Sequence, residues 1–359
     1  MSANDPKRTS LTPSTDLIQM RTMPRASGKV MRRREFITLF GGAAAGWPLV
    51  VQAQRPGGHA EADRQLPFPD EIFLDHVGHF VRDHEAASRS LARAGFAPTP
   101  ASIQVNPDPK GGAPQLTGTG NVTAMLPRGY IEVLFKTADT TLGREFDAAM
   151  ARYAGVQLAA FVVADAAGAH RRLAENGFRV RPLVELQRPV DTGAGAGTAA
   201  FTVARVEPAE MPEGRIQILT HHTEHTVWQP RWLTHPNGAL GLASMTIVVA
   251  DVDEAAGRFA RFCGRVAKPS PSGQSIALDR GRVELVGADA FARMLPQIPI
   301  PSVPFMGTYS IRVRSLSAIK TILAGAGIAT SPLGADLLAR FPEELGQGAW
   351  IFTERGSAS

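Results

Sequence analysis

The sequence has little cysteine, and over most of its length it has no excess of basic residues. Cys263 is the single cysteine in 359 residues, so an internal disulfide bond is excluded. Because Cys263 lies in an apolar helical pattern, we predict a buried, inert thiol there. Residues 1–53 hold 8 of the 38 Lys and Arg and 3 of the 33 Asp and Glu, which leaves 30 of each in the rest. That remainder is formally neutral and lacks the basic stripe expected of a nucleic-acid-binding protein.

Long apolar runs are also missing. The modestly apolar run at residues 37–51 is too short for a stable membrane span, and it is interrupted by Gly41, Gly42, Gly46 and Pro48. Arg33-Arg34-Glu35-Phe36-Ile37 leads into this run, and Val51-Gln52-Ala53 follows it as a small-residue cleavage site. The order of these features resembles the twin-arginine (Tat) signal peptides of exported bacterial proteins.

This resemblance implies that residues 31–53 form a Tat signal peptide, which would engage the Tat translocon. The alternative is an amphipathic N-terminal helix of the fold. An export signal does not normally follow 30 polar residues, so we interpret residues 1–30 as disordered or as the product of a mis-assigned start. Met31 would then be the true start. We predict a linker at residues 54–69 and a periplasmic or secreted location.

A strand followed by a capped helix occurs four times. Each copy has an apolar strand, an Asp or Ser at the N-cap, an amphipathic helix and a Gly at the helix end. The predicted strands are residues 74–81, 157–163, 243–249 and 309–313, and the caps are Asp83, Asp165, Asp251 and Ser315. Weaker strand patterns follow each helix. The repeating unit is therefore predicted to be β-α-β-β-β.

Repeated units whose first strand reads Leu74-Asp75-His76-Val77 resemble the vicinal oxygen chelate superfamily, in particular its glyoxalase-like branch. Residues 129–134 (Gly-Tyr-Ile-Glu-Val-Leu) and the histidine-containing segments 219–223 and 235–239 support the same resemblance. It implies an α+β fold in which four βαβββ modules pair into two open barrels.

We predict three regions within this fold. The first module pair is expected at residues 70–225 and carries the metal site that the resemblance implies. A linker is expected at residues 226–240, where Trp and Pro residues interrupt the periodicity. The second pair, residues 241–355, has no histidine at the corresponding positions and is expected to be structural or to shape the substrate site.

Superfamily members hold a divalent metal with side chains from the first and last strands of each paired module. By position, the resemblance implies His76, Glu132 and Gln217 as metal ligands. Leu158 occupies the fourth position and cannot bind a metal, which puts glyoxalase I activity itself in doubt. A mixed nitrogen and oxygen set suits Zn, Fe(II), Mn, Ni or Co and leaves positions open for a chelating substrate.

Strand alternation adds candidates for catalysis. It places His76 on the same face as Leu74 and opposite His79, and it places His221 on the face of Gln217. His221 or His222 could replace the ligand missing at Leu158 or act in acid–base catalysis, as could Glu132; a solvated linker that carries histidines is the alternative. The predicted substrate-binding residues are Asn121, His225 and Trp228.

Two main functions follow. The first is an exported, metal-dependent enzyme of lyase, isomerase or dioxygenase type that acts on a small oxygen-chelating substrate. Tat export favours it, because that route carries proteins already folded around a cofactor. The second is a metal-free protein that binds or sequesters a small molecule, which Leu158 favours. A periplasmic solute-binding protein is a third hypothesis, against which the βαβββ repeat argues.

Overall fold

The computed structural model describes residues 64–106, 108 and 110–354. These residues lie in one unit of the chain, which spans residues 56–359. The predicted start region (1–30), the signal peptide (31–53) and all but the end of the 54–69 linker fall outside the described residues. Within the described part, no helix combines the length and the apolar character that a membrane span requires.

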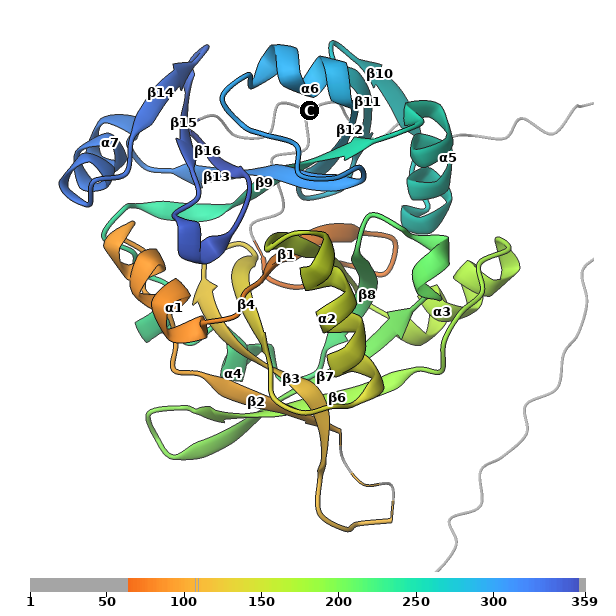
Figure 1. Ribbon diagram of the computed structural model, residues 1–359. Coiled ribbons are helices and arrows are strands. Elements are labelled where there is room, and N and C mark those ends of the chain that lie inside the picture. The colour runs from red at the N-terminus through yellow and green to blue at the C-terminus, as the bar shows by residue number, and fades with distance from the viewer. Residues whose placement is uncertain (1–63, 107, 109, 355–359) are drawn as a thin grey trace, which may run out of the picture. The chain divides into compact units, whose positions relative to one another are not determined.

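The first two modules follow the predicted βαβββ order (Figure 1). Module one consists of β1 (Ile72–Phe80), α1 (His84–Arg93), β2 (Ser102–Asn106), β3 (Gln115–Met125) and β4 (Tyr130–Lys136). Module two consists of β5 (Gly155–Val163), α3 (Ala166–Glu175), β6 (Val184–Asp191), β7 (Ala196–Arg205) and β8 (Arg215–His221). Helix α2 (Thr141–Arg152) connects the modules, and the short helix η1 (Pro208–Glu210) lies between β7 and β8.

The short helices α4 (Glu224–Val227) and η2 (Pro230–Trp232) lead to module three. That module consists of β9 (Ala239–Val249), α5 (Val252–Cys263), β10 (Ala267–Ser270), β11 (Gly273–Ala277) and β12 (Arg282–Gly287). After α6 (Ala288–Met294), module four consists of β13 (Phe305–Val313), α7 (Leu316–Gly325), β14 (Thr330–Leu333), β15 (Asp336–Arg340) and β16 (Ala349–Thr353). Helix η3 (Glu343–Leu345) precedes the last strand.

The modules pair as predicted, and the α+β fold of paired modules is confirmed. Modules one and two form a barrel in the order β1-β4-β3-β2-β6-β7-β8-β5, and modules three and four form a second eight-stranded sheet, β10-β11-β12-β9-β13-β16-β15-β14. In each pair the two first strands run antiparallel, β1 against β5 and β9 against β13. The first barrel is closed by a contact between β2 and β6, where Val105 pairs with Gln187.

The predicted caps explain why the helices begin where they do. The Asp83 carboxylate accepts a hydrogen bond from the backbone N–H of Ala86 at 2.9 Å, and Asp165 does the same for Gly168 at 2.9 Å. Such bonds satisfy N–H groups that the first helical turn leaves unpaired. Helix α5 ends at Gly264, whose φ of 64° lies in the left-handed region that favours glycine.

Cys263 is buried, as predicted. It belongs to an apolar cluster between the helices and the outer faces of the strands, together with Phe259 and Phe262. Burial raises the pKa of the Cys263 thiol to about 12, so the sulfur stays protonated and unreactive at neutral pH. A second cluster, which includes Phe80, fills much of the barrel interior.

Strand β1 contains a bulge that strand alternation does not predict. Leu74 pairs with Phe161 and His76 with the adjacent Ala160, which leaves Asp75 as an extra residue on β1. A bulge shifts the alternation of side chains by one residue. Leu74 therefore packs in the outer apolar cluster, while His76 faces the barrel interior. The prediction that Leu74 and His76 share a face is wrong for this reason.

Candidate functional site

A small polar cavity lies inside the first barrel. Its volume is about 30 Å³, which is room for one or two water molecules but not for an organic substrate. Polar residues from both modules of the pair line it: His76, Gln104, Asn121, Glu132 and Gln217. The structure thus gathers the three predicted metal ligands and Asn121 around one cavity, and Leu158 lines it too.

The His76 imidazole is held from both sides. Its Nδ1 lies 2.7 Å from Asp75 Oδ2, and its Nε2 lies 3.5 Å from Glu132 Oε2. Because the Asp75 carboxylate accepts a hydrogen bond from Nδ1–H, Nε2 is left to face the cavity. The ring also stacks on Tyr130, with ring centroids 4.3 Å apart. The bulge at Asp75 makes this arrangement possible, since it brings two successive side chains together.

Asp75 has a second histidine partner. His221 Nε2 lies 3.2 Å from each Asp75 carboxylate oxygen. Burial by itself would raise the pKa of Asp75, but the charges and hydrogen bonds of His221 and His76 outweigh it. They hold the pKa of this carboxyl well below its usual range. Asp75 is therefore an ionised anchor that orients two imidazoles.

Glu132 is 4% exposed and is held by amides as well as by His76. Its Oε1 accepts hydrogen bonds from Asn121 Nδ2 at 2.5 Å and from Gln104 Nε2 at 3.3 Å. Its Oε2 faces His76. An imidazole and a carboxylate that face each other in this way can pass a proton to or from a molecule placed beside them.

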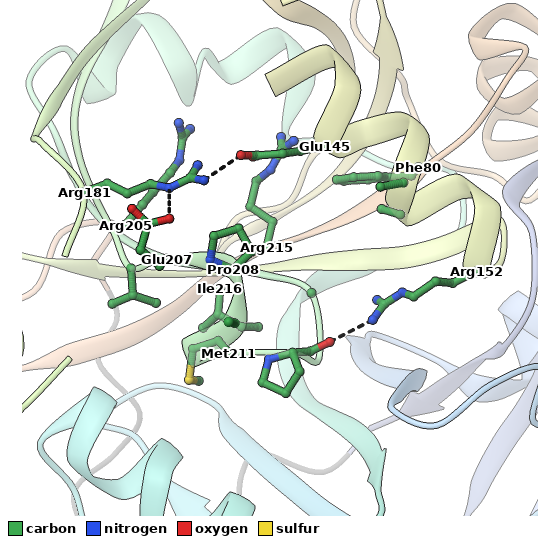
Figure 2. A pocket seen from close by; sticks show the side chains of 16 residues that line it. Phe80, Glu145, Arg152, Arg181, Arg205, Glu207, Pro208, Met211, Arg215 and Ile216 are labelled. Atoms are coloured by element: carbon green, nitrogen blue, oxygen red, sulfur yellow. Dashed lines mark hydrogen bonds and ion pairs between the residues drawn. The ribbon is translucent and has the colours of Figure 1, made fainter. Parts of the chain in front are cut away.

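A second, larger cavity of about 410 Å³ adjoins one end of the barrel. Figure 2 shows its lining, which comes from α2, from the segment that contains η1, and from the ends of β1, β7 and β8. Arg205 and Arg215 line both this cavity and the small one that contains His76. The larger cavity lies within the size range of small-molecule sites in proteins.

Comparison with known proteins identifies the family. Residues 74–263 match the model of the glyoxalase-like domain, which is more than half of the 359 residues. The chain belongs to the glyoxalase-like domain family. The comparison with curated proteins gave no match.

Two solved structures share the fold of this glyoxalase-like protein. A hypothetical protein from Staphylococcus aureus superimposes with a TM-score of 0.52 at 11% identity, over 79% of this chain and 98% of its own. A mutant of 4-hydroxymandelate synthase from Streptomyces coelicolor gives 0.51 at 14% identity, over 81% of this chain and 94% of its own. The fold is therefore that of the vicinal oxygen chelate superfamily.

The divalent metal that this superfamily implies fits the donors of the glyoxalase-like domain poorly. His76 Nε2 and Glu132 Oε2 are close enough to share an ion, but Gln217 Oε1 accepts a hydrogen bond from Arg205 Nε at 2.9 Å. Leu158 offers only carbon atoms at the fourth position. Across the described residues, no three His, Cys, Asp or Glu side chains gather in a way that could hold a metal ion. Cationic guanidinium groups in the same cavity further disfavour a dication.

The arginines of the cavity were not anticipated from the sequence. Arg188, Arg205 and Arg215 come from β6, β7 and β8, and all three line the small cavity. The alternation of side chains along β8 predicts that Arg215 faces inward, because Arg215 is two residues before Gln217 on the same strand. An arginine on the inner face of a predicted barrel strand is therefore a sequence signal for a cation inside the barrel.

The remaining predicted site residues lie away from both cavities. His221 is buried beside Trp228, with ring centroids 4.7 Å apart, and it shares the inner face of β8 with Gln217 as alternation predicted. The exposed His222 ring bonds Thr202 Oγ1 at 2.7 Å on the outside. His225 is exposed on α4. Neither cavity is lined by any of these four residues, so their catalytic and substrate-binding roles stay predictions.

Proposed function

We propose that this glyoxalase-like protein binds a small organic molecule at the first barrel and does so without a resident metal. One observation carries the proposal: Gln217 Oε1 is bound by Arg205, and Leu158 stands at the fourth ligand position. Only His76 and Glu132 then remain to hold an ion, two donors where a stable site in proteins usually has three or four. The metal-free alternative thus replaces the metal-dependent enzyme as the leading hypothesis.

The binding cavity would be the larger one, since the small cavity cannot hold an organic molecule. Phe80, Met211 and Ile216 provide apolar surface there. Apolar walls with a few polar groups are typical of small-molecule sites. This role is the second function predicted from the sequence, a metal-free protein that binds or sequesters a small molecule.

The metal content of the purified, folded protein tests the proposal. We expect fewer than about 0.1 equivalents of transition metal, because two donors next to guanidinium groups bind a dication weakly. Inductively coupled plasma mass spectrometry gives the measurement. About one equivalent in the wild type, lost in His76→Ala, would overturn the metal-free assignment.

A matched gain-of-function variant controls this measurement. Leu158→His combined with Gln217→Glu supplies four side-chain donors around the same cavity. This double variant should retain about one equivalent of Zn or Ni after the same purification. Its metal loading shows that the assay detects a metal at this position when the donors are present.

We also propose that the protein is exported. The support is the leader sequence, in which Arg33-Arg34 precedes the modestly apolar run. Replacing both arginines by lysine keeps the charge and should hold the full-length precursor in the cytoplasm, as immunoblots of cell fractions would show. Arg55→Lys, just after the predicted cleavage site, is the control and should leave export unchanged. Equal export of both variants would contradict the proposal.

A further inference from the structure

Two arginines stand where the two cavities of the first barrel meet. Arg205 ends β7 and Arg215 begins β8, and both side chains line the large and the small cavity. Because Arg205 pairs with Gln217 across the two strands, Arg215 is its diagonal neighbour on the same inner face. Figure 2 shows both guanidinium groups among the residues that line the larger cavity.

These two cations lack carboxylate partners. Within the described part of the chain, the Arg215 side chain makes no hydrogen bond or ion pair, and the Arg205 side chain makes a single hydrogen bond, from Nε to Gln217 Oε1 at 2.9 Å. Arg215 has only the ring of Phe80 nearby, with its guanidinium carbon 5.0 Å from the ring centroid. Most of the hydrogen-bond donors of both guanidinium groups are thus available to a ligand.

The neighbouring carboxylates are already engaged by other donors. Arg181 binds Glu145 Oε1 at 2.6 Å and Glu207 Oε2 at 3.2 Å, as the dashed lines in Figure 2 mark. Glu132 Oε1 accepts from Asn121 and Gln104. The acids therefore lower the positive potential at Arg205 and Arg215 without contacting either group. Arg188, 6% exposed, adds a third cation to the small cavity.

Partly buried guanidinium groups without carboxylate partners are unfavourable for the folded protein. Burial lowers the pKa of Arg205 to about 9 and that of Arg215 to about 10, so both remain cationic at neutral pH. A partly buried charge without a partner destabilises a fold, and an anion that enters the cavity would relieve this. Unfavourable charges of this kind cluster at binding sites.

We propose that Arg205 and Arg215 bind the carboxylate of an organic acid whose apolar body occupies the larger cavity. The inference rests on the proposed function and adds the chemical class of the ligand. The planar guanidinium fork matches a carboxylate in two parallel hydrogen bonds. The cavity of about 410 Å³, walled by Phe80, Ala149, Met211 and Ile216, has room for an aromatic or branched aliphatic body.

Calorimetric titration with matched probes tests the inference. The probes are phenylacetate, 3-phenylpropanoate and 4-phenylbutanoate, each compared with its neutral amide at pH 7 and low salt. At least one acid should bind ten or more times more tightly than its amide. Arg215→Gln should weaken binding of that acid at least tenfold and leave the amide unchanged, while Arg215→Lys should retain part of the preference.

Two controls distinguish a loss of carboxylate binding at Arg215 from the effects of net charge and of misfolding. Arg171→Gln removes the same charge from an exposed position of α3 and should leave binding unchanged. Thermal melting checks folding, and Arg215→Gln should melt no lower than the wild type, since it removes an unpartnered charge. Unchanged acid binding in a folded Arg215→Gln protein would overturn the inference.

The outcomes also distinguish this inference from the proposed function. Acids and amides that bind equally well would refute the carboxylate site and leave small-molecule binding in place. Acid binding that disappears with a chelator and returns with Zn would refute the metal-free function. Binding of neither series would count against both.

Discussion

Glu213→Gln should lower the free energy of unfolding by about 3 kcal/mol, because it breaks a buried ion pair. Glu213 is 1% exposed and Arg258 8% exposed, and their carboxylate and guanidinium groups meet in two hydrogen bonds of 2.8 Å each. The substitution keeps the shape of the side chain and removes its charge. Arg258 is left as a buried cation, whose loss of a partner dominates the effect.

The pair joins the two halves of the fold. Glu213 lies between η1 and β8 of module two, and Arg258 lies on α5 of module three. Glu254 also binds Arg258, at 2.9 Å, and partly compensates for the loss of Glu213. For this reason we expect the lower end of the range of about 3–5 kcal/mol found for broken buried pairs.

Urea unfolding followed by circular dichroism measures this change. Glu85→Gln is the matched control, because Glu85 pairs with Arg89 on α1 at 3.7 Å with both side chains mostly exposed. An exposed pair of this spacing contributes less than about 0.5 kcal/mol. Equal, small effects of the two substitutions would show that the buried pair does not stabilise the fold.

Lowering the pH from 6.5 to 4 should destabilise the protein by about 3 kcal/mol through His79 alone. Burial lowers the pKa of His79 from 6.5 to about 4, although a backbone hydrogen bond to Leu345 works in the opposite direction. Between these two pH values the unfolded chain binds a proton that the folded chain does not. Stability therefore falls as the pH falls through this window and is unaffected by His79 above it.

The hydrogen bonds around His79 explain why the neutral ring is favoured. Trp350 Nε1 donates to the Tyr309 hydroxyl at 2.6 Å, and that hydroxyl is 2.9 Å from His79 Nε2. His79 Nδ1 donates to the carbonyl of Leu345 at 2.9 Å. With its lone pairs facing Trp350, the Tyr309 hydroxyl donates to Nε2, which must then be unprotonated. A second proton on the ring would leave a buried donor without an acceptor.

Unfolding free energies of the wild type and His79→Gln, measured from pH 4 to pH 8, test this prediction. The variant is expected to be less stable at pH 7, because it loses part of the network, but its stability should change less between pH 6.5 and 4. The difference between the two curves isolates His79 from the other groups that titrate in acid. Parallel curves would refute the assignment.

Helix caps and apolar periodicity were sufficient to predict the strand and the capped helix that begin each module. The four predicted caps, Asp83, Asp165, Asp251 and Ser315, all cap their helices as predicted. Caps and apolar periodicity act within a few residues, so they can be read from a sequence. Helix α2 was not predicted, because it lies in the connection between two modules, outside the repeating pattern.

The candidate site was predicted only in part. His76, Glu132 and Gln217, which the resemblance implied as metal ligands, and Asn121, predicted to bind substrate, line one cavity. The role of Asp75 depends on the bulge in β1, which results from the pairing with β5 and leaves no mark in the sequence of β1 itself. His222 and His225 were grouped with the site because they are close to it in sequence, yet both are exposed.

The sequence by itself determined the repeat, because strands and capped helices follow from periods of two and 3.6 residues and from capping chemistry. The pairing of modules and the positions at the barrel interior were implied by the resemblance to the superfamily. Only the tertiary structure decided what the interior is made of. It placed Arg205 on Gln217, and Arg188, Arg205 and Arg215 around His76 and Glu132. Barrel closure brings these side chains together from strands that are distant in the sequence, so their combined charge is a property of the fold and not of any segment.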